Sequence, residues 1–474
     1  MLSGVVQHRI VNQHLRFAVI RHLLSLLLLF VPSAVFAADS KSGDQAAWKA
    51  GASSAVITPK SMMWMAGYAA RTKPADGVAM DLYAKALVLD DGTSGPLAII
   101  TIDLVSIPRE VRRDAAARIQ KEHGIPPERL LINASHTHSG PELRELRTAT
   151  TDNASLRARE ANEYCDSLVD TFTKLVGESL AKRVPADVDY THAKCAFAMN
   201  RRRPTEKGYQ NAPWSEGPVD HRVPVLRVVA KEPKKEIAFV FGYACHCTVL
   251  GWQKFSGDYA GAAQAYIQEK HPGAVAMFMN GCSGDQNPYP RRDPGYVEIH
   301  GKTLATAVDS ALDTPPKRLT GTIQAAYREI PIRFERQPPR EELEQRAKST
   351  TDKLDAGLAT RLLELLDHGE PLMKDYPYPI QVVRFGKELT LIALGGEVVV
   401  DYSIRLQREI EDPIVWVAGY SNDVMTYIPS RRVWDEGGYE AGDAMKWNHF
   451  PSRWAPELEE EIVKGVKDVR AGLK

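Results

Sequence analysis

Hydrophobic and polar positions over residues 82–134 predict two strands, a helix and a third strand. The strands are apolar runs with a turn between the first two, and the helix has apolar residues at helical spacing followed by a glycine. The second strand ends at Asp103 and the third leads to His136. The predicted elements are strands at 82–89, 97–102 and 130–134 and a helix at 109–122 with Gly124 as its stop.

Four later apolar runs have the same arrangement, because each is followed by a cluster of polar residues. Functional groups of α/β proteins gather beyond the carboxyl ends of strands, so these clusters are expected to meet at one rim. Each cluster taken alone is equally explained by turn or cap residues. Together they predict an α/β fold of mixed β-sheets flanked by helices, with the active site at the C-terminal ends of the strands. The runs and the polar segments after them are 237–244 with Cys245-His246-Cys247, 274–279 with residues 280–285, 389–394 with Gly395-Gly396-Glu397, and 414–418 with residues 419–423.

Neither a Gly-, Pro- or Ser-rich linker nor an internal repeat divides residues 38–474, which predicts one catalytic domain. An insertion with two helices is expected within it. Four leucines of the second helix have helical spacing, which predicts packing in a core, with the lining of a substrate cleft as the alternative. The insertion spans 337–374, with helices at 341–348 and around Leu358, Leu362, Leu365 and Leu366, and an amphipathic surface helix is expected at 457–469.

The composition is that of a soluble globular protein, with 474 residues, 44% hydrophobic and 25% charged. Residues 1–37 hold three arginines, no acidic residue and an apolar run, and they predict a secretory signal peptide, with an uncleaved N-terminal anchor as the alternative. The remaining chain has 57 basic and 60 acidic residues, a balance that gives no indication of a nucleic-acid partner. We therefore expect an exported protein, either periplasmic or secreted.

The five cysteines do not make a disulfide framework in a chain of this length, and their odd number leaves at least one free or paired outside the chain. Cys245 and Cys247 flank His246 and are candidate metal ligands. In an extended strand, however, their side chains point to the face opposite that of His246, so we interpret them as buried structural cysteines. The sequence does not fix the pairing of the five, which are Cys165, Cys195, Cys245, Cys247 and Cys282.

Two histidines, His136 and His138, lie two residues apart directly after the apolar run at 130–134. A neutral imidazole is the commonest side-chain ligand for zinc, and the position beyond a strand end is where functional groups gather. The motif therefore indicates a metal site. A single His-x-His pair is equally compatible with two histidines that are hydrogen-bonded in a loop.

The motifs taken together resemble those of the neutral ceramidase family, specifically its amidase domain. The most specific of them is His136-Thr137-His138-Ser139-Gly140-Pro141, and the others occur in the family's order. The resemblance covers most of the chain after residue 37. It begins near Ala55-Val56-Ile57-Thr58-Pro59 and Met65-Ala66-Gly67-Tyr68, passes through Asp103 and the His136 motif, and reaches Tyr439-Glu440.

The resemblance implies a catalytic zinc site. In that family two histidines, a glutamate and a tyrosine hold the metal, and matching motif to motif places them at His136, His246, Glu397 and Tyr427, with one Zn²⁺ per chain. Two imidazoles, one carboxylate and a weak oxygen ligand leave a position for water, as a catalytic zinc requires.

Three further roles follow from the same resemblance. His138 corresponds to a histidine near the reacting carbonyl, Tyr439 to a second active-site tyrosine, and Arg201 to an arginine that contacts substrate. The alternative for Arg201 is a solvated charge cluster, because it belongs to the run Arg201-Arg202-Arg203.

Two aspartates are candidates for the groups that orient the zinc-bound imidazoles. Asp103 follows a predicted strand and Asp258 precedes a predicted helix, and carboxylates often accept the second N–H of a metal-bound histidine. The alternative is that Asp103 caps the strand end and Asp258 the helix start.

The sequence departs from the family at Asn287. Where the family has Gly-Asp-x-Ser-Pro-Asn, this chain has Gly284-Asp285-Gln286-Asn287-Pro288-Tyr289, so asparagine stands in place of an active-site serine. Asparagine is no hydroxyl nucleophile, but it can hydrogen-bond an amide or hydroxyl of the substrate. The chain also ends soon after the last motif. We therefore expect the family's C-terminal immunoglobulin-like domain to be absent and substrate presentation at a membrane to differ.

These observations predict a zinc-dependent amidohydrolase that cleaves an N-acyl amide bond with zinc-activated water. The expected substrate is ceramide, cleaved to sphingoid base and fatty acid, or a related lipid amide, with peripheral membrane contact and no nucleic acid. Alternatives are a zinc hydrolase of another amide or ester and a secreted, non-catalytic metal- or lipid-binding protein. A serine hydrolase with Ser283 as nucleophile is a further alternative, although its turn lacks the Gly-x-Ser-x-Gly spacing.

Overall fold

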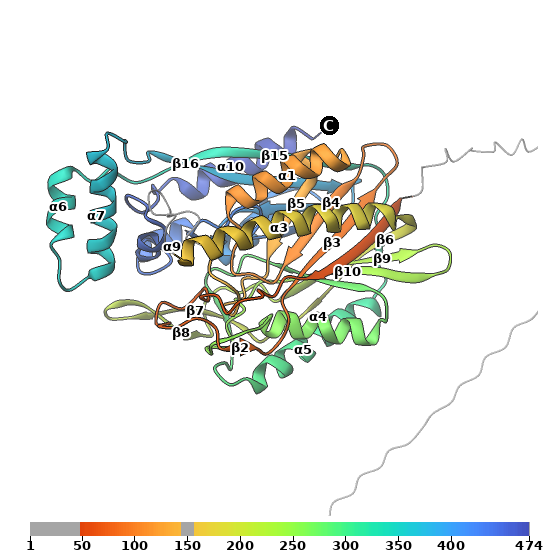
Figure 1. Ribbon diagram of the computed structural model, residues 1–474. Coiled ribbons are helices and arrows are strands. Elements are labelled where there is room, and N and C mark those ends of the chain that lie inside the picture. The colour runs from red at the N-terminus through yellow and green to blue at the C-terminus, as the bar shows by residue number, and fades with distance from the viewer. Residues whose placement is uncertain (1–47, 144–155, 474) are drawn as a thin grey trace, which may run out of the picture. The chain divides into compact units, whose positions relative to one another are not determined.

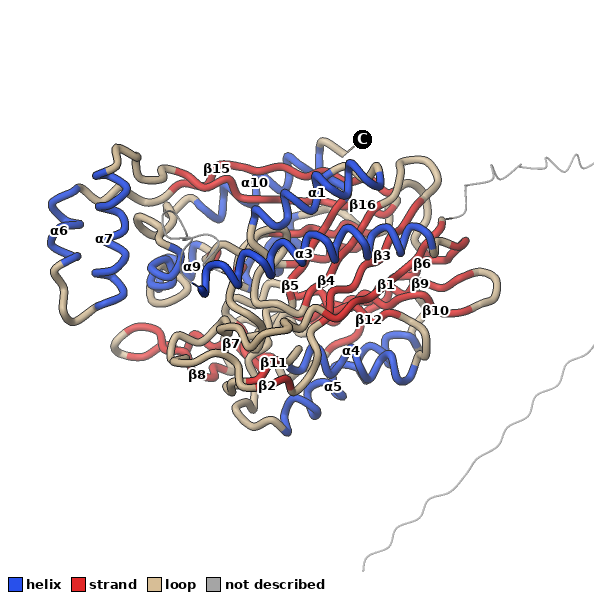
Figure 2. The backbone as a smooth tube through the Cα atoms, viewed as in Figure 1, coloured by secondary structure: helices blue, strands red, loops and turns tan. Residues whose placement is uncertain are grey.

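Two β-sheets pack face to face between layers of helices in the part of the chain that the structure describes (Figure 1, Figure 2). This computed structural model describes residues 48–143 and 156–473, which belong to one compact unit. The predicted signal peptide at 1–37 lies outside these ranges. Within them, no helix combines the length and the apolar character needed to cross a bilayer.

The larger sheet comprises nine strands among the described residues, in the order β12-β10-β9-β6-β1-β3-β4-β5, with β14 paired to β6. It is mixed, because β4 pairs parallel with β5 and β10 pairs parallel with β12, whereas the other neighbours are antiparallel. Its strands are β1 (Lys49–Val56), β3 (Tyr83–Asp90), β4 (Leu97–Ile102), β5 (Leu130–Ala134), β6 (Val184–Lys194), β9 (Arg222–Ala230), β10 (Lys235–Tyr243), β12 (Val275–Asn280) and β14 (Lys317–Arg318).

The smaller sheet has the order β15-β16-β17-β19 and is also mixed, with β17 parallel to β19. Its strands are β15 (Ile323–Arg333), β16 (Asp375–Phe385), β17 (Leu389–Leu394) and β19 (Ile414–Ala418). Short pairings outside the two sheets join β2 (Gly77–Val78) to β11 (Lys254–Phe255), β7 (Ala198–Thr205) to β8 (Gly208–Trp214) and β13 (Gln286–Pro288), and β18 (Glu397–Val398) to β20 (Tyr427–Ile428).

Helices cover the outer face of each sheet. Helices α1 and α3 pack on the β1-β3-β4-β5 part of the larger sheet, α4 and α5 on its β9-β10-β12 part, and α8 and α10 on the smaller sheet (Figure 1). The helices are α1 (Arg109–His123), α3 (Leu156–Ala181), α4 (Asp258–Lys270), α5 (Gly295–Leu312), α6 (Arg340–Ala347), α7 (Lys353–Asp367), α8 (Val400–Glu409), α9 (Arg431–Glu436) and α10 (Leu458–Ala471), with short 3-10 turns η1 (Pro127–Arg129) and η2 (Asp443–Asn448).

The strand β4 shows why its sequence is apolar throughout. Successive side chains of a strand point to opposite faces. Leu97 and Ile99 enter the core between the two sheets, whereas Ile100 and Ile102 enter the core beneath α1 and α3. A continuous apolar run therefore marks a strand that is covered on both faces, as parallel strands usually are.

The α/β fold with mixed sheets and flanking helices is confirmed. The predicted elements are present with boundaries that agree or differ by one or two residues, as is usual at element ends. The strands at 97–102, 130–134, 389–394 and 414–418 agree at both ends, and β3, β10, β12, α1, α6 and α10 are displaced by one or two residues. Helix α1 ends at Gly124, which adopts the left-handed conformation with φ 72° that favours glycine.

The predicted insertion forms a helical hairpin, α6 and α7, that lies away from the sheets at the left of Figure 1. Leu358 and Leu362 are buried in a separate small core, and Leu365 and Leu366 are partly buried against it, so the packing hypothesis is confirmed. Lys446 of η2 forms a 2.7 Å ion pair with Asp352 at the start of α7. The hairpin therefore supports the short turn η2.

Candidate metal centre

Six strand ends of the two sheets meet at one rim, and Asn133 holds three of them together. Its side-chain amide donates to the Gly419 carbonyl at 2.7 Å, and its carbonyl accepts from the Asn280 N–H at 2.8 Å. The ends of β5, β12 and β19 are thereby joined by one buried side chain. The loops after β4, β5, β10, β12, β17 and β19 supply the residues described below.

The four residues predicted to bind metal come together at this rim. His136 follows β5 and His246 follows β10. Glu397 and Tyr427 lie opposite each other in the parallel pair of β18 and β20. The His136 N–H donates to the Leu104 carbonyl at 2.9 Å, which fixes this segment beside the end of β4.

Backbone strain accompanies these positions. His136, Tyr420 and Asn422 have φ values of 62°, 51° and 64°, in the left-handed region that non-glycine residues seldom adopt. Such residues persist only where the surrounding structure holds them, and they cluster at functional sites. All three lie in the loops that follow β5 and β19.

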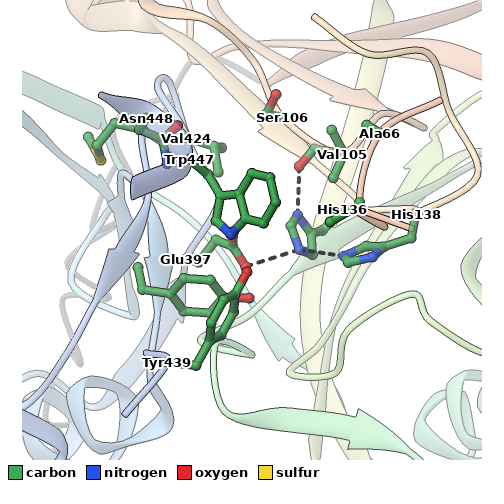
Figure 3. Close-up of a pocket in the computed structure, with 14 residues that line it drawn as sticks. Ala66, Val105, Ser106, His136, His138, Glu397, Val424, Tyr439, Trp447 and Asn448 are labelled. Atoms are coloured by element: carbon green, nitrogen blue, oxygen red, sulfur yellow. Dashed lines mark hydrogen bonds and ion pairs between the residues drawn. The ribbon is translucent and has the colours of Figure 1, made fainter. Parts of the chain in front are cut away.

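The donor atoms of the predicted ligands converge. His136 Nε2 lies 3.1 Å from Glu397 Oε2 (Figure 3). His246 Nε2 lies 3.3 Å from the same oxygen and 3.3 Å from the Tyr427 hydroxyl. Tetrahedral ligands about 2.0 to 2.1 Å from a zinc ion lie roughly 3.3 Å from one another. The observed spacings are therefore those of a metal ligand set.

The positions of the ring protons show that the cluster suits a cation. Nδ1 of His136 lies 2.6 Å from the Val105 carbonyl, and Nδ1 of His246 lies 2.7 Å from the Ser283 carbonyl. A carbonyl only accepts, so each Nδ1 carries the proton and each neutral ring presents a lone pair at Nε2. Glu397 Oε2 is buried without a hydrogen-bond donor among the described residues. A metal ion would satisfy the electron pairs of Glu397 Oε2, whereas His246 Nε2 also has a donor, Arg201, at 3.1 Å.

The electrostatics of the cluster favour a neutral His246 and an ionised Glu397. Burial and the neighbouring charge of Arg201 lower the pKa of His246 to about 3. Burial raises the pKa of Glu397, but the His136 and His246 imidazoles outweigh it and hold that pKa well below its usual range. These are the protonation states that metal ligands require.

Arg201 is brought to the same site and is buried. Its guanidinium donates to Tyr427 at 2.9 Å and to Glu440 at 2.8 Å, and it lies 3.1 Å from His246 Nε2. Arg202 is also buried and pairs with Glu440 and Glu436. The solvated-cluster alternative is therefore wrong for Arg201, which places a fixed positive charge beside the ligands.

His138 stands next to the ligands and is held by the loop before β2. Its Nε2 lies 3.1 Å from His136 Nε2, and its ring contacts the Tyr68 ring at 4.9 Å. A Cβ built on Gly67 would meet His138 Cγ at 2.4 Å, so only glycine allows this approach. His136, His138 and His246 together form a cluster that can hold a metal ion.

A cavity of about 250 Å³ opens onto the cluster. His136, His138, Glu397 and Tyr427 form its polar side, and Tyr439 lies at its mouth with 43% of its surface exposed. Figure 3 shows Val424 and Asn448 on one side and Ala66 and His138 on the other. The remaining lining is mostly apolar: Ala66, Gly67, Ala69, Val105, Ser106, Val424, Met425, Trp447 and Asn448.

Three predicted roles need correction. Asp103 and Asp258 do not accept from the imidazoles, because the carbonyls of Val105 and Ser283 do so. Asp103 instead accepts from the Tyr83 N–H and from Gln264, and Asp258 accepts from the main-chain N–H groups of Leu250, in the loop after β10, and of Tyr259. The N-cap of α4 is Gly257, and no side chain caps this helix, so the helix-cap alternative for Asp258 is not supported either.

Asn287 is completely buried and is not among the residues that line the cavity. Its side-chain oxygen accepts from Thr248 at 3.2 Å and from Arg201 at 3.5 Å, and its amide donates to Asn211 at 3.2 Å. Its polar atoms are therefore engaged within the protein, and a direct contact with substrate is not supported. The third correction is thus that Asn287 accepts a hydrogen bond from Arg201 instead of contacting the substrate.

All five cysteines are buried, and Cys245 and Cys247 belong to the core between the larger sheet and α4. Burial raises the pKa of both thiols well above the usual range, which disfavours the thiolate that a metal ligand needs. They are structural cysteines, as predicted.

Glu440 was not predicted as a partner of two arginines, and Trp447 and Met425 were not predicted as cavity lining. The Tyr439-Glu440 motif was a signal for Glu440, since it adjoins a predicted site residue. No pattern marks Trp447, because a 3-10 turn supported by a distant hairpin carries it.

Comparisons with known proteins identify the family and the fold. The family described as neutral/alkaline non-lysosomal ceramidase, N-terminal, matches residues 48–291, about half of the chain. The crystal structure of neutral ceramidase from Pseudomonas aeruginosa superposes with a TM-score of 0.70 at 19% identity over 90% of this chain and 74% of that one. A ceramidase complexed with C2 gives a TM-score of 0.70 at 18% identity, over 89% and 74%. No curated protein sequence matches significantly.

Proposed function

The chain belongs to the neutral/alkaline non-lysosomal ceramidase family, and we propose that it is a zinc-dependent hydrolase of an N-acyl amide bond. One observation carries the proposal. Donor atoms of His136, His246, Glu397 and Tyr427, from four separated segments, converge with spacings of 3.1 to 3.3 Å, and all but His246 line a cavity. A buried set of this kind has little structural value without a cation.

The proposed ligands of zinc are His136, His246, Glu397 and Tyr427. Zinc held there would lower the pKa of a bound water toward about 7 and polarise the scissile carbonyl. The carbonyls of Val105 and Ser283 fix the tautomer and the ring orientation of the two histidines.

The surrounding residues supply charge stabilisation and proton transfer. Arg201 is buried and donates to Tyr427, so its charge acts in a dry environment on negative charge that develops at the substrate oxygen. Tyr439, at the cavity mouth 5.3 Å from the Tyr427 ring, offers a hydroxyl on the same side. We assign to His138 the delivery of a proton to the leaving amine.

The proposed substrate is ceramide or a related lipid amide. The apolar lining by Val105, Val424 and Met425 suits an acyl chain, and a family relative is described as complexed with C2. The serine-hydrolase alternative loses support, because the Ser283 hydroxyl is buried, has no hydrogen-bond partner in the described ranges and does not line the cavity. An activated serine needs a base in contact with its hydroxyl.

The test is metal content and turnover of purified protein on ceramides, other N-acyl amides and esters, with and without a chelator. We expect about one zinc per chain and amide hydrolysis that the chelator abolishes and zinc restores. Activity confined to non-ceramide amides or esters would keep the mechanism and change the substrate. Protein that binds no metal and hydrolyses none of these compounds would favour a binding protein.

Gly67→Ala should lower turnover about 100-fold while zinc stays bound. The new Cβ would meet the His138 ring at 2.4 Å and displace it, and a misplacement of about 1 Å can cost that much rate. Gly208→Ala is the control, because Gly208 has a similar φ of 100° and open space around its Cβ position. Both variants should be less stable, by about 1 kcal/mol or more. Equal turnover in the two variants would show that the position of His138 is unimportant.

A further inference from the structure

Three arginines surround Tyr68 beside the metal centre. The guanidinium carbons of Arg71 and Arg292 lie 4.9 and 4.7 Å from the centre of the Tyr68 ring. Arg291 lies against the Tyr289 ring at 5.4 Å and donates to the Thr248 hydroxyl at 3.4 Å. We refer to Arg71, Arg291 and Arg292 as the arginine cluster.

Two carboxylates among the described residues act on the arginine cluster, Glu142 on Arg71 and Asp258 on Arg292. No ion pair joins any of its members to an Asp or Glu within residues 48–143 and 156–473, whereas most other arginines there have one. Asp258 lies nearby, but both of its oxygens accept main-chain N–H groups, from Val249, Leu250 and Tyr259. Three neighbouring guanidinium groups repel one another, so an anion bound between them would lower their energy.

Unsatisfied donors lie around the same cluster. Arg71 Nε, the Trp252 indole N–H and the Tyr289 hydroxyl are buried and have no hydrogen-bond partner among the described residues. Arg71 donates through its other nitrogens to carbonyls of the two loops, including that of Trp252 at 3.2 Å. Buried donors usually find an acceptor. Ligand oxygens would supply one here.

The arginine cluster is connected to the metal centre by direct contacts. The Tyr68 ring lies 4.9 Å from the His138 ring, and Arg71 donates to the His138 carbonyl at 2.7 Å. On the other side, Arg291 contacts Thr248, which donates to Asn287, and Asn287 accepts from Arg201. The cluster therefore adjoins His138, to which we assign proton delivery to the leaving amine, but its arginines lie behind the residues that line the cavity.

We propose that the arginine cluster binds a carboxylate or phosphate carried by the amine half of the substrate. The inference rests on the proposed function and deepens it, because it makes the preferred substrate an anionic N-acyl amide. Arginine binds both groups through paired N–H donors, and such charge-assisted hydrogen bonds are the strong ones. In Figure 3 the apolar residue Val424 lies on the side of the cavity away from His138, which leaves that side to the acyl half.

Matched substrates test this proposal. N-lauroyl-4-aminobutyrate is compared with N-lauroyl-4-aminobutanol, and N-lauroylphosphoethanolamine with N-lauroylethanolamine. Each pair shares its amide and differs in one charge, and the two pairs separate carboxylate from phosphate recognition. We expect at least a tenfold higher kcat/KM for the anionic member of one pair, with a preference that declines as salt is added.

The variants Arg292→Gln and Arg291→Gln/Arg292→Gln should lower that preference at least tenfold in the double variant and less in the single one. Arg328→Gln, at an exposed arginine of β15, should leave it unchanged. Neutral substrates hydrolysed as well as anionic ones by the native protein, or a preference that survives the double variant, would overturn the proposal and leave the amidase function intact.

Binding of phosphoethanolamine and 4-aminobutyrate, measured by calorimetry, gives a readout that needs no turnover. We expect one of them to bind and the double variant to lose that binding. If no amide is hydrolysed, the proposed function fails. The calorimetric measurement still tests whether the arginine cluster binds an anion. Failure of both compounds to bind the native protein, or unchanged affinity in the double variant, would overturn it.

Discussion

Glu397→Gln and His246→Ala should each leave the purified protein without bound zinc and lower amide turnover by at least about 1000-fold. The loss of one ligand from a set of four removes most of the affinity for zinc. Without the metal, several kcal/mol of transition-state stabilisation are lost. Glu397→Gln preserves the shape of the side chain, so its effect reports the loss of the negative charge. Metal content by mass spectrometry and turnover on the best amide provide the measurement.

His271→Ala is the control for these ligand variants. His271 lies between Glu236 and Asp309 at 3.4 and 3.3 Å, in a constellation of histidine and carboxylates on α4 and its neighbours, away from the cavity. Zinc content and turnover should both remain native. A His246→Ala or Glu397→Gln protein that keeps one zinc per chain and full turnover would remove these residues from the ligand set.

Glu440→Gln should lower the free energy of unfolding by about 3 to 5 kcal/mol. Glu440 accepts from Arg201 at 2.8 Å and from Arg202 at 2.5 Å, and all three side chains are at most 5% exposed. These two guanidinium groups hold the pKa of Glu440 below its usual range, although burial raises it. Removing the carboxylate leaves the buried charge of Arg201 without an ion-pair partner, whereas Arg202 keeps Glu436, and an uncompensated buried charge costs that much in proteins. Urea unfolding of both proteins gives the value.

Glu460→Gln separates the effect of burial from that of losing an arginine partner. Glu460 also accepts two hydrogen bonds from one arginine, Arg405, but it is 71% exposed. Exposed pairs contribute at most about 1 kcal/mol, so this variant should unfold almost as the native protein does. Equal losses in the two variants would show that desolvation of Arg201 and Arg202 is not the cause.

The sequence predicted which residues lie at the rim better than it predicted the hydrogen bonds and ion pairs that hold them there. His136, His246 and Glu397 each follow an apolar run, so local pattern placed them beyond strand ends, and a family resemblance linked them. The acceptors of the imidazole N–H groups were predicted to be Asp103 and Asp258 and proved to be the carbonyls of Val105 and Ser283. Every residue has a main-chain carbonyl, so no residue type in the sequence indicates which carbonyl accepts the imidazole N–H.

The arginines show a different reason for failure. Arg201-Arg202-Arg203 is a run that usually lies in solvent, and only the distant Glu440 and Glu436 make burial of the first two possible. The partners are separated by more than 200 positions, so no window of sequence contains both. The pairing of β15 with β16 on either side of the α6–α7 hairpin is likewise non-local, and it was not predicted.

The dispersal of the four proposed ligands over positions 136, 246, 397 and 427 has a consequence for how the protein matures. No short peptide of the chain contains more than one of them, so the unfolded polypeptide has almost no affinity for the ion. The two sheets must pack together before a binding site exists, so the metal binds after the chain has folded. A zinc finger behaves in the opposite way, because it folds only when it binds its metal. A metal ion bound at this site would therefore show that the two sheets have packed together.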